Sequence, residues 1–340
     1  MNKFSDPIFT DADKAREYLE AKLWPNGPWC RHCGEADETR IVKVEMTREP
    51  RKPVEGKKHR PSRAGLYRCN TCRQQFTVTV GTVFERSKIP LNTWLLATFL
   101  LCSPKKGMSA HQLWRMLGFG SYRTAWFMAH RIREALKDGG MFGPLGGSGK
   151  VVEADELYQG KRENPLPSKQ RGDRPFTKRG KGGPAAKRVV IGLVERGGKT
   201  KLVHINHATK ESVRDVVVRN ASRESALHTD ESRLYTTLGE EFGAHRTVHH
   251  ASGEYVRYED AAMVTTNTIE NVFSVFRRGI HGVYQHCGEA HLHRYLNEFA
   301  FRYNHRSGLG VSDMERTDEA LKGIEGKRLT YRRIGEAANA

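Results

Sequence analysis

The chain has 340 residues, of which 37% are hydrophobic, and its lysines and arginines outnumber its acidic residues to give a net charge of +18. This length allows two or three domains, and the longest apolar run, Trp94 to Cys102, is too short to span a bilayer. Because polar residues follow Met1 where a signal peptide would be apolar, we expect a cytoplasmic, nucleoid-associated protein with no membrane partner. The positive charge favours a nucleic-acid partner over an inert basic surface.

The cysteines are the first local signal in the chain. Six cysteines without a secretion signal indicate metal binding or free thiols rather than disulfides. Four of them form two Cys-x-x-Cys pairs, namely Cys30, Cys33, Cys69 and Cys72. Two such turns can place four thiolates tetrahedrally around one zinc ion, so the sequence predicts a zinc ribbon with one structural Zn2+. A helix capped by Asp11 or Asp13 precedes it, and the ribbon either contacts DNA or only braces a neighbouring domain.

Helical periodicity dominates residues 91–137. Three helices are predicted, over residues 91–102, 108–117 and 122–136. The turn Gly118–Ser121 joins the last two in a helix-turn-helix pattern, in which His130, Arg131 and Arg133 would face DNA. The alternative is an ordinary three-helix packing unit with a solvated basic face.

A short apolar strand that carries an acidic residue follows a glycine-rich linker. Val151, Val152 and Ala154 predict the strand, and Asp155 comes at its end. A carboxylate in a packed strand is costly unless it is paired or holds a cation. Taken alone, a solvated aspartate at the end of a strand explains this residue equally well.

The segment after Asp155 alternates between strands and helices. Strands are predicted over 187–195 and 200–206 around the turn 196–199, then a helix from Thr209 to about Asn220. A strand ending at Asp230, a helical segment over 234–242 and a strand over 245–250 follow, before an amphipathic helix that contains Glu270. This order predicts an α/β fold built on a mixed sheet with flanking helices.

Three acidic residues occupy related places in this order. Asp155, Asp230 and Glu270 can meet at the carboxyl edge of the sheet, where hard oxygen ligands suit Mg2+ or Mn2+. Two such ions can activate a water or a 3′-hydroxyl and stabilise the leaving oxygen of a phosphodiester. Read separately, each acid is equally a helix cap or half of a salt bridge.

Basic residues near these acids are candidate DNA contacts. Arg277 lies two helical turns after Glu270, with Arg278 beside it, and could hold a phosphate near the metal ions. Lys161 begins a stretch over 161–188 that is rich in Lys, Arg, Gly and Pro. That stretch reads as a mobile basic loop, and next to a catalytic strand it is also a plausible phosphate clamp.

Taken together, these motifs resemble the bacterial insertion-sequence transposases of the DDE type that carry an N-terminal zinc ribbon. The similarity spans nearly the whole chain. It is carried by the paired Cys-x-x-Cys motifs, Glu153-Ala-Asp-Glu156, Thr229-Asp230, Asn267-Thr-Ile-Glu270 and the block from His291 to Arg306. One departure is Arg277, where lysine is commoner in the family; arginine keeps the charge but changes the geometry of a phosphate contact.

The resemblance implies a ribonuclease-H-like catalytic domain with its acidic triad at Asp155, Asp230 and Glu270. It also implies binding of double-stranded DNA at the terminal inverted repeats, strand cleavage and transfer of 3′ ends to target DNA. A homo-oligomer on DNA and the absence of a small-molecule cofactor are expected with this activity. Two alternatives are a DNA-binding regulator without chemistry and a metal-dependent nuclease without strand transfer.

The expected domains follow the chain. They are a zinc ribbon with its helix over 1–85, a helix-turn-helix-like region over 86–140, a catalytic domain over 141–310 and a tail over 311–340.

Overall fold

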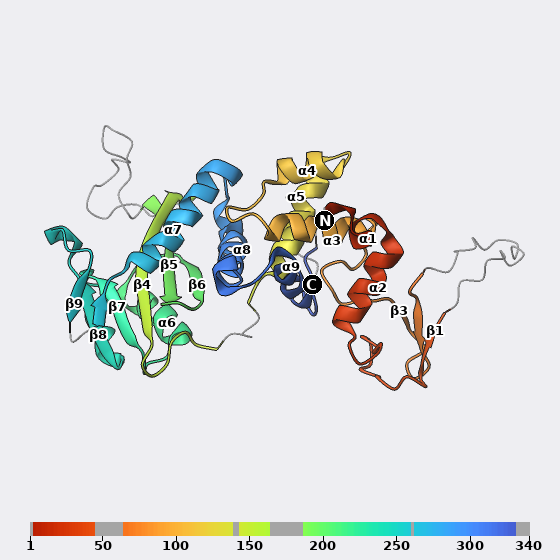
Figure 1. Cartoon of the computed structure of the whole chain (residues 1–340), viewed down its shortest axis with the longest axis horizontal. Coiled ribbons are helices and arrows are strands. Elements are labelled where there is room, and N and C mark those ends of the chain that lie inside the picture. The colour runs from red at the N-terminus through yellow and green to blue at the C-terminus, as the bar shows by residue number, and fades with distance from the viewer. Residues whose placement is uncertain (1–2, 45–63, 139–142, 164–185, 260–261, 331–340) are drawn as a thin grey trace, which may run out of the picture. The chain divides into compact units, whose positions relative to one another are not determined.

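The computed structural model describes residues 3–44, 64–138, 143–163, 186–259 and 262–330 (Figure 1). The chain forms two compact units, the first from residues 1–103, 110–136 and 312–340 and the second from residues 104–109 and 137–311. The structure thus differs from the expected tail, because helix α9 (Asp313–Lys322) belongs to the first unit and packs against helix α3 (Leu91–Cys102). Most of the basic stretch 161–188 lies outside the described residues.

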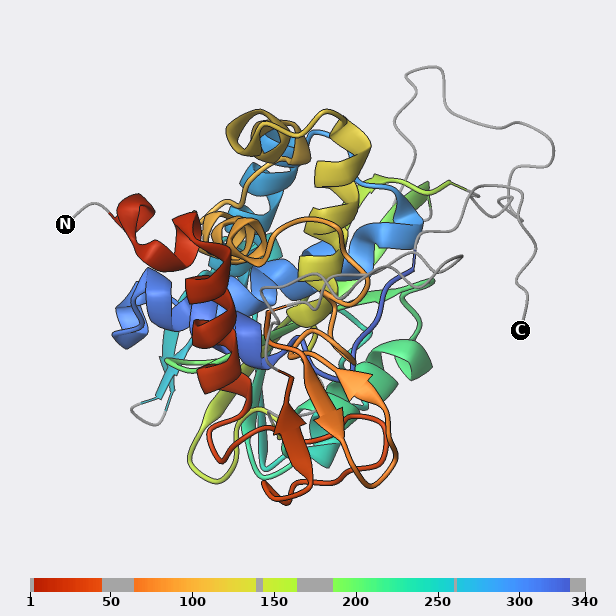
Figure 2. The same ribbon diagram turned by 90° about the vertical axis from the view of Figure 1, so that its right-hand side faces the viewer.

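The first unit begins with short helices followed by a small sheet. The 3-10 helix η1 (Lys3–Ser5) and helix α1 (Pro7–Thr10) precede helix α2 (Ala12–Leu23), whose first turn is capped by Asp11, as predicted. The antiparallel sheet of the ribbon has the order β1 (Ile41–Lys43), β2 (Tyr67–Cys69) and β3 (Gln75–Phe76), drawn in red and orange at the front of Figure 2. Trp24, Tyr67 and Phe76 pack their rings together beside it and supply a core that so small a sheet cannot supply alone.

The three predicted helices of the first unit are confirmed as α3, α4 (Ala110–Leu117) and α5 (Tyr122–Ala135). Helix α3 is buried along most of its length, which explains its nearly continuous apolar sequence. Ser121 caps α5 by accepting a hydrogen bond from the backbone N–H of Arg123, so the turn before it is well defined.

The second unit contains a five-stranded mixed sheet in the order β6-β5-β4-β7-β8. The hairpin β5–β6 continues antiparallel from β4, while β7 and β8 run parallel to β4. A separate antiparallel hairpin, β9–β10, follows β8. The bounds are β4 (Val151–Lys161), β5 (Lys187–Glu195), β6 (Thr200–Ile205), β7 (Ala226–Asp230), β8 (Ala244–Val248), β9 (Arg257–Glu259) and β10 (Ala262–Val264).

Helices cover both faces of this sheet. Helix α6 (Lys210–Asn220), capped by Thr209 as predicted, packs on one face; α7 (Asn267–Gly279) and α8 (Leu292–Asn304) pack on the other (Figure 1). The predicted helix over 234–242 is reduced to turns and the 3-10 helix η3 (Gly239–Glu241). Further short turns are η4 (His250–Ser252), the π-helix η5 (Ile280–Tyr284), η6 (Glu289–His291) and η7 (Ser307–Leu309).

Strand β4 separates two hydrophobic cores by the alternation of its side chains. Val152 and Ala154 belong to the core under α6, whereas Leu157 belongs to the core under α7 and α8. Glu153 and Asp155 are in phase with Leu157 and therefore share its face. Two acidic residues thus lie on the face that α7 covers.

Helix α7 approaches the sheet very closely at Gly192 of β5. A Cβ atom at this position would lie 2.6 Å from side-chain atoms of both Ile269 and Phe273. Since Gly192 is paired with Asp155 across β4 and β5, this close approach occurs directly beside the acidic residue. Among the described helices, none is long and apolar enough to cross a membrane.

Candidate active site and zinc centre

Two of the predicted acids, together with an unpredicted one, form a compact cluster. The sequence predicts Asp155 at the end of its strand. In the structure β4 continues beyond Asp155 to Lys161. Asp230 is the last residue of the neighbouring parallel strand β7. Carboxylate oxygens of Asp155, Asp230 and Glu156 all lie within 4.8 Å of one another. Glu156 belongs to the motif Glu153-Ala-Asp-Glu156, but the sequence alone predicts no role for it.

Burial and mutual repulsion shift the titration of these groups. Burial raises the pKa of Asp155 to about 8, and the charges of Glu156, Asp230 and Glu270 add to this rise. Burial likewise raises the pKa of Glu156 to about 7 and increases that of Asp230. Carboxylates arranged in this way are stabilised when a cation lies between them. A set of hard oxygen donors fits Mg2+ or Mn2+, and Asp155 and Asp230 are the residues best placed to hold it.

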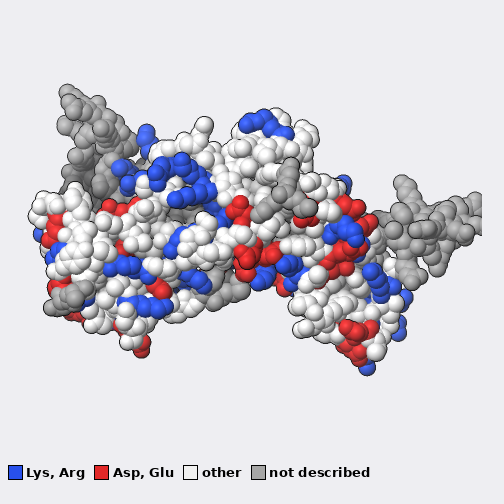
Figure 3. Space-filling view, viewed as in Figure 1, with Lys and Arg blue, Asp and Glu red and all other residues white. Residues whose placement is uncertain are grey.

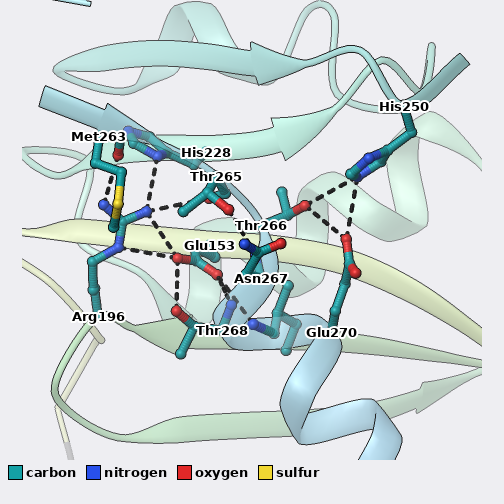
Figure 4. Close-up of polar contacts among 11 residues, drawn as sticks. Glu153, Arg196, His228, His250, Met263, Thr265, Thr266, Asn267, Thr268 and Glu270 are labelled. Atoms are coloured by element: carbon teal, nitrogen blue, oxygen red, sulfur yellow. Dashed lines mark hydrogen bonds and ion pairs between the residues drawn. The ribbon is translucent and has the colours of Figure 1, made fainter. Parts of the chain in front are cut away.

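Glu270 lies beside the cluster, on α7. Its Oε1 accepts a hydrogen bond from Thr266 Oγ1 at 3.1 Å and lies 3.2 Å from Nε2 of His250 (Figure 4). It is not among the three carboxylates within 4.8 Å, but it is close enough for its charge to contribute to the raised pKa of Asp155. The structure therefore brings Asp155 and Asp230 together and places Glu270 at their side, in contact with His250.

A second polar cluster, centred on Glu153, lies at the start of α7 (Figure 4). The side chain of Glu153 is fully buried and accepts hydrogen bonds from Arg196 and from Thr268 and Ile269. Arg196 also contacts Nδ1 of His228 at 3.3 Å. Burial and the nearby arginines lower the pKa of His228 to about 4, so its ring is neutral and Nδ1 can accept from the guanidinium.

Sequence reasoning missed the part that Glu153 plays in this cluster. The available signal was its spacing from Asp155, since a second charged residue at the same phase of a buried strand must find partners inside the fold. What those partners are depends on tertiary contacts with residues far along the chain.

The four predicted zinc ligands converge in the first unit. The Sγ atoms of Cys30, Cys33, Cys69 and Cys72 lie within 4.8 Å of one another. The Sγ distances are 3.6 Å from Cys30 to Cys72 and 3.7 Å from Cys33 to Cys69. Four ligands at Zn–S distances of about 2.3 Å form a tetrahedron with edges of about 3.8 Å, so this spacing fits a structural zinc ion.

The predicted DNA contacts differ in their accessibility. Lys161, Arg277 and Arg278 are exposed in the second unit. Figure 3 shows lysine and arginine side chains gathered over the region where α7 runs. These three side chains can therefore reach a polyanion.

His130, Arg131 and Arg133 do not face solvent, so the expectation that they face DNA is wrong. Their exposed fractions are 1%, 8% and 1%, because the second half of α5 packs inside the first unit. The guanidinium of Arg131 donates to the backbone carbonyl of Glu85 and lies over the ring of Trp94. Its long side chain therefore serves packing, and the accessible end of α5 is its first turn, at Tyr122 and Arg123.

The second unit thus combines a mixed sheet in which β4 is antiparallel to β5 and parallel to β7 with acidic residues from β4, β7 and the helix over them. This topology and site define a ribonuclease-H-like domain of the DDE type. The comparisons with known proteins give the family. Residues 144–304 match the ISXO2-like transposase domain, and residues 10–75 match the transposase zinc-ribbon domain. The chain belongs to this family of insertion-sequence transposases.

A similar protein carries the same association with a mobile element. The chain is 27% identical over 302 residues to a protein of Halobacterium salinarum described as an uncharacterized protein in transposable element ISH50. The alignment covers 86% of this chain and 91% of that protein.

Proposed function

We propose that this chain binds the terminal inverted repeats of its insertion sequence, cleaves DNA strands there and transfers the 3′ ends to target DNA. The observation that carries this proposal is the meeting of Asp155 and Asp230 at adjacent parallel strands, with Glu270 on the helix beside them. Asp155 and Asp230 are half-buried, so an uncompensated negative charge on either carboxylate is unfavourable, which supports a role as ligands of divalent cations.

Asp155, Asp230 and Glu270 would hold two Mg2+ or Mn2+ ions. When bound, such ions activate the attacking hydroxyl and stabilise the leaving oxygen of the phosphodiester. The chain itself positions the DNA: exposed Arg277 and Arg278 on α7 would hold phosphates near the acids, and Lys161 at the far end of β4 would hold a phosphate farther along the DNA. The chemistry needs no small-molecule cofactor, because the nucleophiles are water and a DNA 3′-hydroxyl.

The first unit would find the element ends. Its zinc ribbon, with Zn2+ held by the four cysteines, and the turn between α4 and α5 are the candidate DNA-reading elements. Joining two ends to one target requires both ends to be held at once, so we propose a homo-oligomer on DNA. Its place of action would be the cytoplasm, at the nucleoid.

The test is strand cleavage and joining on a labelled element-end duplex with Mg2+ or Mn2+, comparing wild type with Asp230→Asn. We expect the variant to bind the duplex but to lose at least about a thousandfold in cleavage rate, the effect of losing several kcal/mol of charge stabilisation. Asp215→Asn is the matched control, because Asp215 is an exposed residue of α6 that pairs only weakly with Arg219 at 3.7 Å.

Each remaining outcome assigns a different activity. Cleavage by wild type without joining would identify a nuclease, and binding without cleavage would identify a DNA-binding regulator. Equal cleavage by wild type and Asp230→Asn would remove the acidic cluster from the mechanism.

A further inference from the structure

We infer that Glu153 is a positioning residue of the active site, which caps helix α7 from strand β4 and thereby fixes Glu270 relative to Asp155. This inference rests on the proposed function, since it concerns the same acidic site. Glu153 would act by holding helix α7 in place, and not by contact with DNA or metal.

The contacts of the Glu153 carboxylate are concentrated on the first turn of α7 (Figure 4). Its Oε2 accepts from the backbone N–H groups of Thr268 at 2.8 Å and Ile269 at 3.0 Å. Its Oε1 accepts from the hydroxyl of Thr268 at 2.9 Å. One side chain on the sheet thus satisfies three donors of a helix that begins 114 positions later, at Asn267.

Helix α7 has no local side-chain cap for its second and third N–H groups, because the hydroxyl of Thr265 accepts only from the first, that of Asn267, at 3.1 Å. Thr266 occupies the N-cap position, but its side chain makes no capping hydrogen bond. The N–H groups of the first turn of any helix have no partners within the helix, and a side-chain oxygen normally accepts from the second or third of them. Thr268 and Ile269 are these second and third residues, so Glu153 occupies the place of an N-cap. Its negative charge is also favourable at this end of the helix dipole.

The remaining partner of Glu153 holds the segment that leads into α7. Arg196 donates to Glu153 Oε1 through Nη2 at 2.9 Å and through Nε at 3.1 Å. The same guanidinium donates to the backbone carbonyls of Met263 at 2.7 Å and Thr265 at 3.2 Å. Glu153 and Arg196 together therefore tie β10, the connection after it and the first turn of α7 to the sheet.

On both the strand and the helix, a residue of this cap lies within two positions of an acid of the proposed active site. Glu153 is two residues before Asp155 on the same face of β4, and Glu270 directly follows Ile269. A shift of the first turn of α7 would therefore move Glu270 relative to Asp155 and Asp230. Errors of about 1 Å in the placement of reacting groups can lower a rate by about a hundredfold.

The first experiment measures amide hydrogen exchange in Glu153→Gln without added metal or DNA. The amide of glutamine keeps the shape of the side chain but loses the charge and one acceptor oxygen. We expect the N–H groups of Thr268 and Ile269 to exchange about tenfold faster, because their cap is weakened. The matched control is Glu195→Gln, which removes the negative charge that Lys150 contacts at 2.8 Å on the same sheet but leaves Glu153 and its partners in place.

The second experiment measures Mn2+ dependence and DNA affinity in the same variants. For Glu153→Gln we expect the Mn2+ concentration at half-maximal cleavage to rise about 10- to 100-fold, the usual effect of losing a residue that orients metal ligands. The dissociation constant for the element-end duplex should not change, and Glu195→Gln should behave as wild type in both measurements. If Glu153→Gln does not fold, Glu153→Asp keeps the charge near Arg196 but withdraws it from α7, and the same results are expected.

The outcomes separate this inference from the proposed function. Unchanged exchange at Thr268 and Ile269, or an unchanged Mn2+ requirement in an active enzyme, would overturn the role of Glu153. If wild type neither binds Mn2+ nor cleaves DNA, the proposed function fails, and the role of Glu153 in placing a catalytic residue fails with it. Hydrogen exchange would then still decide whether Glu153 caps α7.

Discussion

Asp155 is surrounded by other acids, and that fact determines how its protonation couples to folding. Its pKa rises from 3.8 to about 8 on folding, chiefly through burial, then through Glu156 and Asp230. Between these pH values the folded chain holds a proton that the unfolded chain releases. Folding stability contributed by this group is therefore lost as pH rises from about 4 to about 8.

We expect the melting temperature, without added Mg2+ or Mn2+, to fall across this pH window, and Asp155→Asn to reduce the slope. Glu156 and Asp230 shift in the same direction, so part of the slope should remain in the variant. Added Mn2+ should raise the melting temperature more at pH 8 than at pH 5, because it competes with protons for the same oxygens. An identical pH slope in Asp155→Asn would show that Asp155 is not the coupled group.

For single residues, the sequence predicts a role where the signal lies in neighbouring residues. It misses a role where the contact partners are far away in the sequence. Asp155 and Asp230 follow from acids at the ends of predicted strands, although β4 continues well beyond Asp155. The partners of Glu153 come from α7 and the β5–β6 turn, and no local pattern specifies them. Arg131 illustrates the opposite error, since a basic residue on a helix is usually solvated but here is packed against Trp94.

The elements that carry the site depend on one close contact between a helix and a strand. Helix α7 packs over β5 at Gly192, where a methyl group would lie 2.6 Å from Ile269 and Phe273. Both are hydrophobic residues on the buried face of the helix, as expected of an amphipathic helix. The sequence does not predict that glycine is needed opposite them, because this need depends on how near the helix comes to the sheet.

We expect Gly192→Ala to lower the free energy of unfolding by about 1–3 kcal/mol, as overpacking of a core usually does. Because α7 would be pushed away from Asp155, cleavage should fall further than stability alone explains. Urea denaturation and cleavage rates below the unfolding transition measure the two effects. Gly308→Ala is the control, since a Cβ there has nothing within 4 Å. Wild-type stability in Gly192→Ala would mean that α7 has room to move.

Most elements could be predicted because their signals lie within the element. Strands β5 and β6 flank a glycine turn, and α6 begins at a capping box of Thr209 and Ser212. The hairpin β9–β10 was missed because its strands are three residues long and too short to show a pattern. The predicted helix over 234–242 was wrong beyond a single 3-10 turn, because its apolar residues, including Tyr235 and Leu238, pack individually into the core under α6.

At the scale of the whole molecule, the zinc centre and the acidic cluster belong to different compact units. In its described residues the ribbon has three short strands and a small aromatic core, so much of its stability should come from metal binding. The sheet of the second unit has two hydrophobic cores of its own. Loss of zinc should therefore affect the two units unequally.

We expect Cys72→Ser to lose its bound zinc and to make residues 10–75 sensitive to proteases, while the sheet of the second unit stays resistant. Binding of the element-end duplex should fall sharply, since the first unit would no longer recognise it. Zinc content, limited proteolysis with mass spectrometry and a binding assay measure these effects. Cys102→Ala removes a buried thiol of α3 in the same unit and should keep one zinc per chain. Proteolysis of both units in Cys72→Ser would show that their folding is coupled.

The alternation of side chains along β4 has a consequence for how such sequences can diverge. Glu153 and Asp155 work on the same face only because one residue separates them. An insertion or deletion of a single residue there would turn one of the two carboxylates toward α6 and separate the helix cap from the acidic cluster. Homologous sequences should therefore keep the spacing Glu-x-Asp unchanged.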